Sequence, residues 1–283
     1  MNMHAEHGLM CGFLLCATPM ATVAWGQANQ GPRHSETIKH VSHAPWEALS
    51  QKKIFFGHQS VGGNLITGMA TIVREQDSVH FPLRIVEITR PEEFGAEPIF
   101  AHAWLGQNAF PESKIKAFAD FIRGGIGNKA DIAFFKFCYI DFSANTDTSE
   151  IFGKYRNAMF DLRRGFPRTT FVHVTVPLVE QRSGTKDLVK ALLGRSIKDV
   201  DANVKRNVFN ALLRKEYSGT EPLFDLAQVE SSYLDGKRET FERDGKVYEA
   251  LIPDYTDDGG HLNKKGSQLA VSNLLLYLMT LEK

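Results

Sequence analysis

Two kinds of segment alternate along this sequence. Short apolar runs rich in β-branched and aromatic residues are followed by longer amphipathic runs, which is the pattern of βα units around a parallel sheet. Five runs are expected to be strands, at residues 53–57, 83–88, 131–138, 170–176 and 222–226. Helices are expected at residues 61–74, 111–123, 149–164, 201–217 and 264–279. The alternation predicts a doubly wound α/β sandwich with a five-stranded parallel sheet.

Two segments lie outside this alternation. Residues 178–199 form a polar and basic insertion. Residues 240–251 carry Asp244-Gly245 between alternating side chains, which predicts a β-hairpin. Either segment could wall a substrate cleft.

The composition is that of an ordinary globular protein with a full-sized core, because 43% of the residues are hydrophobic and 23% are charged. Lys plus Arg and Asp plus Glu both number 33, so the chain has no net charge to attract nucleic acid or an anionic membrane. We therefore expect no nucleic-acid partner, and one domain over residues 29–283.

The first 28 residues differ from the rest. Residues 8–25 are free of charged side chains and are followed by a small-x-small pattern, Gly26-Gln27-Ala28, which predicts a cleaved secretory signal. No Lys or Arg precedes this run, so a retained N-terminal membrane anchor is the alternative. We expect a periplasmic or secreted protein with no stable membrane insertion after cleavage, and cytoplasmic residence is the other possibility.

The cysteines agree with this division. Cys11 and Cys16 lie within the predicted signal, which leaves Cys138 as the one cysteine of the mature chain. No internal disulfide is then available, and stability must come from packing.

Open α/β sheets place their ligand sites at the carboxyl ends of the strands. After the first expected strand comes the sequence GHQSVGGN, residues 57–64, in which Ser60 occupies a glycine-rich turn at the start of a helix. Backbone N–H groups and the helix dipole would there favour an alkoxide or an oxyanion. The alternative is that Ser60 is a plain helix N-cap.

A second polar motif precedes the last expected helix. Asp258 stands three residues before His261 in a glycine turn, and a carboxylate so placed can hold an imidazole in one tautomer as a general base requires. The alternative is a solvated histidine in a loop of turn residues. The pair becomes persuasive only together with Ser60.

These two motifs resemble blocks of the SGNH or GDSL hydrolases. The Asp258-Gly-Gly-His261 motif and the apolar helix after it look like the family's last block, and the Ser60 turn looks like its first. His58-Gln59 precedes the serine where the name-giving motif has Gly-Asp. The resemblance implies a flavodoxin-like three-layer α/β/α sandwich, with Ser60 as nucleophile, His261 as base and Asp258 as its partner.

The resemblance also assigns an oxyanion hole. Gly106 lies where the second block is expected, and its N–H would join that of Ser60. The third block normally carries an asparagine that donates to the oxyanion, but Ile140 occupies that position here and cannot donate. Asn108, Gln59 or a backbone group is expected to replace it.

Other residues near these blocks are expected to bind substrate or support the site. The substrate-binding set comprises His58, Gln59, Trp104 and Tyr139, because they flank the predicted blocks and sugars stack on rings such as those of Trp104 and Tyr139. Asp141 is expected either to orient the nucleophile turn or to cap the following loop. His173 and Cys138 are expected to be buried core residues.

The predicted function is that of a serine esterase acting on O-acetyl or short-chain acyl esters, with carbohydrate esters and small-molecule esters as candidate substrates. No cofactor and no metal ion are expected. An O-acetyltransferase that uses the same three residues is one alternative. A non-catalytic carbohydrate-binding or assembly protein on the same fold is the other, motivated by the missing asparagine.

Overall fold

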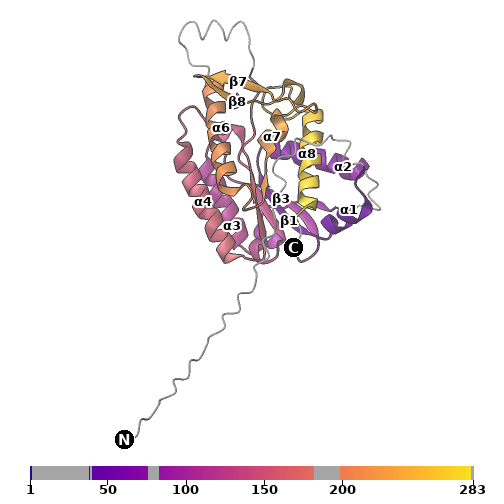
Figure 1. Ribbon diagram of the computed structural model, residues 1–283. Coiled ribbons are helices and arrows are strands. Elements are labelled where there is room, and N and C mark those ends of the chain that lie inside the picture. Colours follow the sequence, from indigo (N-terminus) through magenta and orange to yellow (C-terminus); the bar gives the residue numbers. More distant parts are fainter. Residues whose placement is uncertain (2–37, 39, 76–82, 182–197, 282–283) are drawn as a thin grey trace.

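The computed structural model describes Met1, Ile38 and residues 40–75, 83–181 and 198–281. Six strands of these residues form one parallel sheet in the order β2-β3-β1-β4-β5-β6 (Figure 1). The strands are β1 (Lys53–His58), β2 (Ile85–Glu87), β3 (Ile99–Trp104), β4 (Ile132–Phe135), β5 (Thr170–Val174) and β6 (Leu223–Phe224). The predicted α/β fold with a parallel sheet is confirmed.

The sheet has six strands, and the predicted number of five is wrong because β3 was missed. Its sequence, Ile-Phe-Ala-His-Ala-Trp, contains two alanines and a histidine, which lowers its β-propensity below that of the other runs. Tertiary pairing overrides this weak preference, since β3 lies between β2 and β1 and is buried over Ile99–Ala103.

Helices cover both faces of the sheet (Figure 1). One face carries α3 (Pro111–Arg123), α4 (Thr148–Gly165) and α6 (Lys198–Tyr217), and the other carries α1 (His43–Ser50), α2 (Val61–Glu75) and α8 (Lys264–Met279). A short helix, α7 (Leu226–Ser231), follows β6, and 3₁₀ turns occur at Pro91–Glu93, Ile126–Asn128, Tyr139–Asp141 and Pro253–Tyr255. The molecule is thus a three-layer sandwich.

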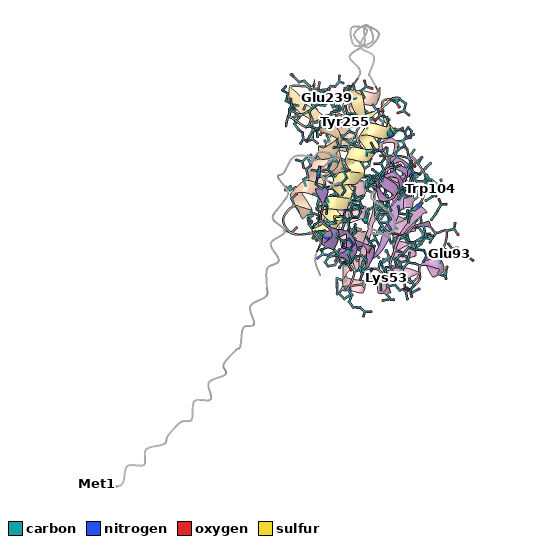
Figure 2. All side chains as sticks on the ribbon, turned by 90° about the vertical axis from the view of Figure 1, so that its right-hand side faces the viewer. Met1, Lys53, Glu93, Trp104, Glu239 and Tyr255 are labelled. Carbon is teal, nitrogen blue, oxygen red and sulfur yellow. The ribbon has the colours of Figure 1, made fainter. Side chains whose placement is uncertain are left out.

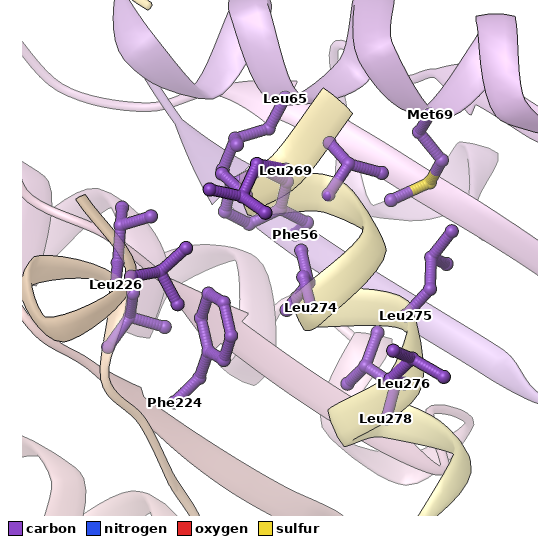
Figure 3. Close-up of a cluster of buried hydrophobic side chains, with 14 of the residues drawn as sticks. Phe56, Leu65, Met69, Phe224, Leu226, Leu269, Leu274, Leu275, Leu276 and Leu278 are labelled. Carbon is purple, nitrogen blue, oxygen red and sulfur yellow. The ribbon is translucent and has the colours of Figure 1, made fainter. Parts of the chain in front are cut away.

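Alternate side chains of β1 point to opposite faces of the sheet, so β1 contributes to the core on both sides. Ile54 and Phe56 point to the α2 and α8 side, whereas Phe55 packs in the cluster of α3 and α4. Figure 3 shows the first cluster, in which Phe56 and Leu65 meet the apolar side chains of α8. Each fully buried phenylalanine or leucine contributes about 1.5–3 kcal/mol relative to exposure.

The predicted hairpin is present as β7 (Thr240–Arg243) and β8 (Lys246–Glu249). Asp244 and Gly245 both have positive φ, as a tight hairpin turn requires. The predicted insertion at 178–199 falls largely outside the described residues, as do the predicted signal except Met1 and part of the proposed 29–283 domain. Among the helices that are described, none combines the length and apolar character needed to cross a bilayer.

Strand register brings the predicted blocks to one edge of the sheet. His58 at the end of β1 lies beside Trp104 at the end of β3, and Gly57 lies beside Phe135 at the end of β4. The segments that follow these three strands therefore meet at the carboxyl edge.

Candidate active site

Ser60 occupies a tight turn between β1 and α2. Its φ of 48° lies in the left-handed region, which non-glycine residues adopt rarely and at some cost in energy. The turn is closed by Gly62, whose N–H donates to the Gln59 carbonyl at 2.9 Å. A Cβ on Gly62 would lie 2.3 Å from the His58 Cβ, so only glycine fits there. The sequence thus holds one serine in a strained turn above the sheet.

The Ser60 hydroxyl points away from the helix that follows it. Its Oγ lies 2.6 Å from Nε2 of His261, a residue 201 positions later in the chain. Within the described residues Oγ bonds to no N–H of α2, as a side-chain N-cap would. The plain-cap interpretation of Ser60 therefore does not describe this turn.

His261 is held by Asp258 on its other side. Asp258 Oδ2 lies 2.6 Å from His261 Nδ1, while Oδ1 accepts the backbone N–H groups of Gly260 at 2.9 Å and His261 at 2.8 Å. Because a carboxylate only accepts, Nδ1 carries the proton and Nε2 is left to accept from Ser60. The structure brings Ser60, His261 and Asp258 into one hydrogen-bonded line.

The charge state of Asp258 suits this role. Burial opposes ionisation, but hydrogen bonds from the Gly260 N–H, the His261 ring and the His261 N–H outweigh it and hold the pKa below its ordinary value. The carboxylate therefore stays ionised at pH values where ordinary aspartates take up a proton.

Tyr139 packs against the turn that carries Gly260 and His261. Its ring contacts the His261 ring edge-on at 5.5 Å between centroids, and a Cβ on Gly260 would lie 2.8 Å from its Cζ. Arg206 Nε donates to the Tyr139 carbonyl at 2.7 Å. Burial raises the pKa of Tyr139, so its hydroxyl stays protonated at neutral pH. Tyr139 was expected to contact substrate, and the structure places it half-buried against His261.

His58 lies beneath the nucleophile turn. Its side chain is buried, and Nε2 lies 3.0 Å from His102 Nδ1. Burial, with the nearby charge of Lys136, lowers the pKa of His58 to about 2, so the imidazole is neutral at neutral pH. His58 was expected to bind substrate, and the structure places its ring under the turn, with the Trp104 ring centroid 4.7 Å away.

The second block forms a loop at the end of β3. Gly106 has a φ of 65°, and a Cβ there would lie 2.7 Å from Lys114 N, so the loop requires glycine. Gln59 Nε2 donates to the Gly106 carbonyl at 3.2 Å and ties this loop to the Ser60 turn. Within the described part of the chain the backbone N–H groups of Ser60 and Gly106 donate to nothing. Both are free to bind an anion.

The orientation of the Asn108 side-chain amide follows from its hydrogen bond with Lys114. Lys114 Nζ donates to Asn108 Oδ1 at 3.0 Å. Because an ammonium can only donate, the oxygen of the amide faces Lys114 and Nδ2 faces away, with its two N–H donors unused among the described residues. Asn108 and Gln59 are the two side-chain candidates for an oxyanion donor. The Asn108 amide N–H groups have no acceptor among the described residues, whereas the Gln59 amide already donates to the Gly106 carbonyl.

A buried ion pair, which sequence reasoning missed, joins the second and third blocks. Lys114 Nζ lies 2.6 Å from Asp141 Oδ2, and the two side chains are 1% and 0% exposed. Asp141 also accepts the backbone N–H groups of Ala109 at 3.0 Å and Cys138 at 2.7 Å. Asp141 thus caps the 3₁₀ turn that it ends and anchors the Gly106 loop. The sequence signal for this pair was the position of Lys114 beside Ile115, within the apolar face of α3.

Removing this ion pair is expected to destabilise the protein strongly. Lys114→Met leaves the Asp141 carboxylate buried without a counter-ion, which should lower the free energy of unfolding by about 3–5 kcal/mol. Lys116→Met on the same helix removes an exposed pair with Asp120 and should change it by less than about 1 kcal/mol. Urea unfolding of both variants checks this, and equal effects would contradict the assigned role of the buried pair.

Trp104 presents a fixed aromatic face beside the Ser60 turn. Trp104 lies at the surface of the molecule (Figure 2) and is 49% exposed. Its Nε1 donates to Glu87 Oε2 at 3.1 Å. The ring lies close to Gly63, whose added Cβ would be 3.1 Å from it. Ile140, also 49% exposed, and Phe110, 61% exposed, follow the ends of β4 and β3. The exposed Trp104 ring therefore adjoins the Ser60 turn.

The structure also shows where the possible metal ligands, Cys138 and His173 lie. Among the described residues no group of three or more His, Cys, Asp or Glu side chains could hold a metal ion. Cys138 is buried between β4 and the 3₁₀ turn at Tyr139–Asp141, as expected for a core cysteine. His173 is also buried, between Tyr155 at 2.7 Å and Glu221 at 3.0 Å.

No protein-family model matches the sequence, and no curated protein matches it. Solved structures are similar in fold at low sequence identity. An acetyl xylan esterase is 12% identical, with 78% of this chain and 96% of that chain covered and a TM-score of 0.44. A lipase/acylhydrolase from Enterococcus faecalis is 12% identical, with 81% and 95% covered and a TM-score of 0.40.

The periplasmic domain of a lipopolysaccharide acetyltransferase from Salmonella ser. Paratyphi A is also similar. It is 12% identical, with 84% of this chain and 92% of that chain covered and a TM-score of 0.41. These similarities concern the fold alone.

Proposed function

We propose that the protein is a serine esterase that cleaves acyl esters by a two-step acyl transfer. The observation that carries this proposal is the line from Ser60 Oγ to His261 Nε2 and from His261 Nδ1 to Asp258 Oδ2, both steps at 2.6 Å. Nucleophile, base and orienting carboxylate in hydrogen-bond contact are what activation of a serine requires.

The proposed reaction uses these groups in turn. His261 takes the Ser60 proton as Oγ attacks the ester carbonyl, and the backbone N–H groups of Ser60 and Gly106, with Asn108 Nδ2, hold the resulting oxyanion. His261 then gives the proton to the leaving alcohol. A water molecule, deprotonated by His261, cleaves the acyl-enzyme and releases the acid, which restores Ser60.

The proposed substrates are O-acetyl or short-chain esters on a carbohydrate. Support comes from Trp104, whose indole N–H donates a hydrogen bond to Glu87 and whose exposed face lies beside the Ser60 turn. An aromatic face of this kind can pack against a sugar ring. We also propose export, from the apolar segment and small-x-small pattern within residues 1–28.

Acetate release separates the candidate functions. The protein is incubated with 4-nitrophenyl acetate and with acetylated xylo-oligosaccharides, each with and without an unacetylated sugar acceptor. An esterase releases free acetate in both cases, whereas a transferase moves the acetyl group to the acceptor. Absence of either product from folded protein would favour a binding protein and overturn the proposal.

Trp104→Ala tests the carbohydrate assignment. Loss of the aromatic face should raise KM for the acetylated oligosaccharide about 3- to 10-fold while leaving KM for 4-nitrophenyl acetate near the wild-type value. Phe110→Ala removes a comparably exposed ring from the next loop and serves as the control. An equal rise in KM for both substrates would count against a sugar contact at Trp104.

A further inference from the structure

A second buried lysine lies directly beneath the Ser60 turn. Lys136 follows β4 and is 1% exposed. Its Nζ donates to the carbonyls of Gln59 and Phe137, each at 3.1 Å, and lies 3.7 Å from Cys138 Sγ. An ammonium has three donors, and these three acceptors occupy them.

Lys136 differs from Lys114 in its lack of a paired carboxylate. Within the described residues no Asp or Glu oxygen lies at ion-pair distance from Lys136 Nζ. Burial lowers the pKa of Lys136, although the charges of Asp141 and Glu230 oppose this. Asp141 is already paired with Lys114, and Glu230 accepts the Leu178 N–H at 2.7 Å. Burial of a cation without a contacting counter-ion costs free energy, which an apolar side chain of similar volume would avoid. Packing alone does not account for a lysine here.

The contacts of Lys136 converge on the nucleophile turn. Its backbone N–H donates to the Gly57 carbonyl at 3.2 Å, and its ammonium donates to the Gln59 carbonyl, so the carbonyls of the residues before and after His58 both accept from one residue. The Gln59 carbonyl also accepts the Gly62 N–H that closes the turn. The left-handed Ser60 follows this carbonyl immediately.

We propose that Lys136 is a positioning residue for the nucleophile, whose ammonium fixes the Gln59 carbonyl and thereby the orientation of the Ser60 hydroxyl and N–H. This inference rests on the proposed esterase function. A charged donor holds a carbonyl more strongly than a neutral one, and strained residues persist only where their surroundings fix them. Lys136 acts through the turn and does not contact substrate.

The test compares Lys136→Met with wild type and with Lys129→Met. Methionine keeps the length and removes the donors, whereas Lys129 donates to the Phe94 carbonyl at 2.8 Å before β4 and away from the site, which makes it the matched control. The rate of Ser60 labelling by a fluorophosphonate and the kcat and KM for 4-nitrophenyl acetate are measured on folded protein. For Lys136→Met we expect labelling and kcat to fall about 10- to 100-fold with KM changed less than about 3-fold. Lys129→Met should match wild type.

Lys136→Arg keeps charged donors and is expected to recover part of the labelling rate that the methionine variant loses. Should the methionine variant fail to fold, Lys136→Gln, a shorter neutral donor, replaces it with the same loss expected. Wild-type labelling and kcat in the folded neutral variant, or an arginine variant no faster than it, would overturn the positioning role. Failure of wild type itself to label would instead refute the esterase proposal, so the two failures are distinguishable.

Discussion

Ser60→Ala is expected to lower kcat for 4-nitrophenyl acetate by roughly 10⁴- to 10⁶-fold, because no other group in the line to His261 can form the acyl-enzyme. Alanine keeps the same backbone constraints, so the fold and its unfolding transition should be unchanged. Steady-state hydrolysis and circular dichroism of the same preparation check both parts.

Ser149→Ala is the matched control for this prediction. Ser149 is an exposed serine in the first turn of α4 whose described hydrogen bond runs from its N–H to Asp147 Oδ1, and its replacement should leave kcat unchanged. Residual turnover by folded Ser60→Ala within about tenfold of wild type would show that a different residue carries the reaction.

Asp258→Asn is expected to lower kcat by about 10⁴-fold with little change in KM. The asparagine amide can donate to the imidazole, which favours the tautomer with its proton on Nε2, and that tautomer cannot accept the Ser60 proton. The loss should persist throughout the neutral range, since the pKa of the wild-type carboxylate already lies below its ordinary value.

Asp257→Asn provides the comparison for Asp258. Asp257 is the preceding residue, and its Oδ1 lies 3.3 Å from Asn263 Nδ2 on the exposed side of the turn. Replacement there should alter kcat less than about 2-fold. Equal losses at both positions would indicate that the turn needs negative charge in general, which would contradict the specific role of Asp258 toward His261.

The sequence predicted the fold class because hydrophobic periodicity reports directly on burial. Short apolar runs identified β1, β4 and β5, and apolar residues at helical spacing identified α2 and α3. The β3 strand was missed because its alanines and histidine weaken the local signal. Its position between β1 and β2 is fixed by pairing with segments about 45 and 15 residues away, which no local window contains.

The candidate site was predicted in part. Ser60, Asp258 and His261 were found from glycine-rich turns next to a helix start, since such turns expose a side chain at a sheet edge. The buried lysines were not, because a lysine beside apolar residues is ordinarily assigned to a solvated face. Lys114 and Lys136 are identified only when the Asp141 and Gln59 oxygens are placed beside them in space.

Intact-mass analysis after fluorophosphonate treatment would decide whether Ser60 is an activated nucleophile. Wild type and Ser60→Ala, both lacking residues 1–28 and both shown to be folded, are treated in parallel. A single adduct on wild type and none on Ser60→Ala is the expected result. An unmodified wild-type protein, or an adduct that persists in Ser60→Ala, would contradict the assignment of Ser60 as the nucleophile.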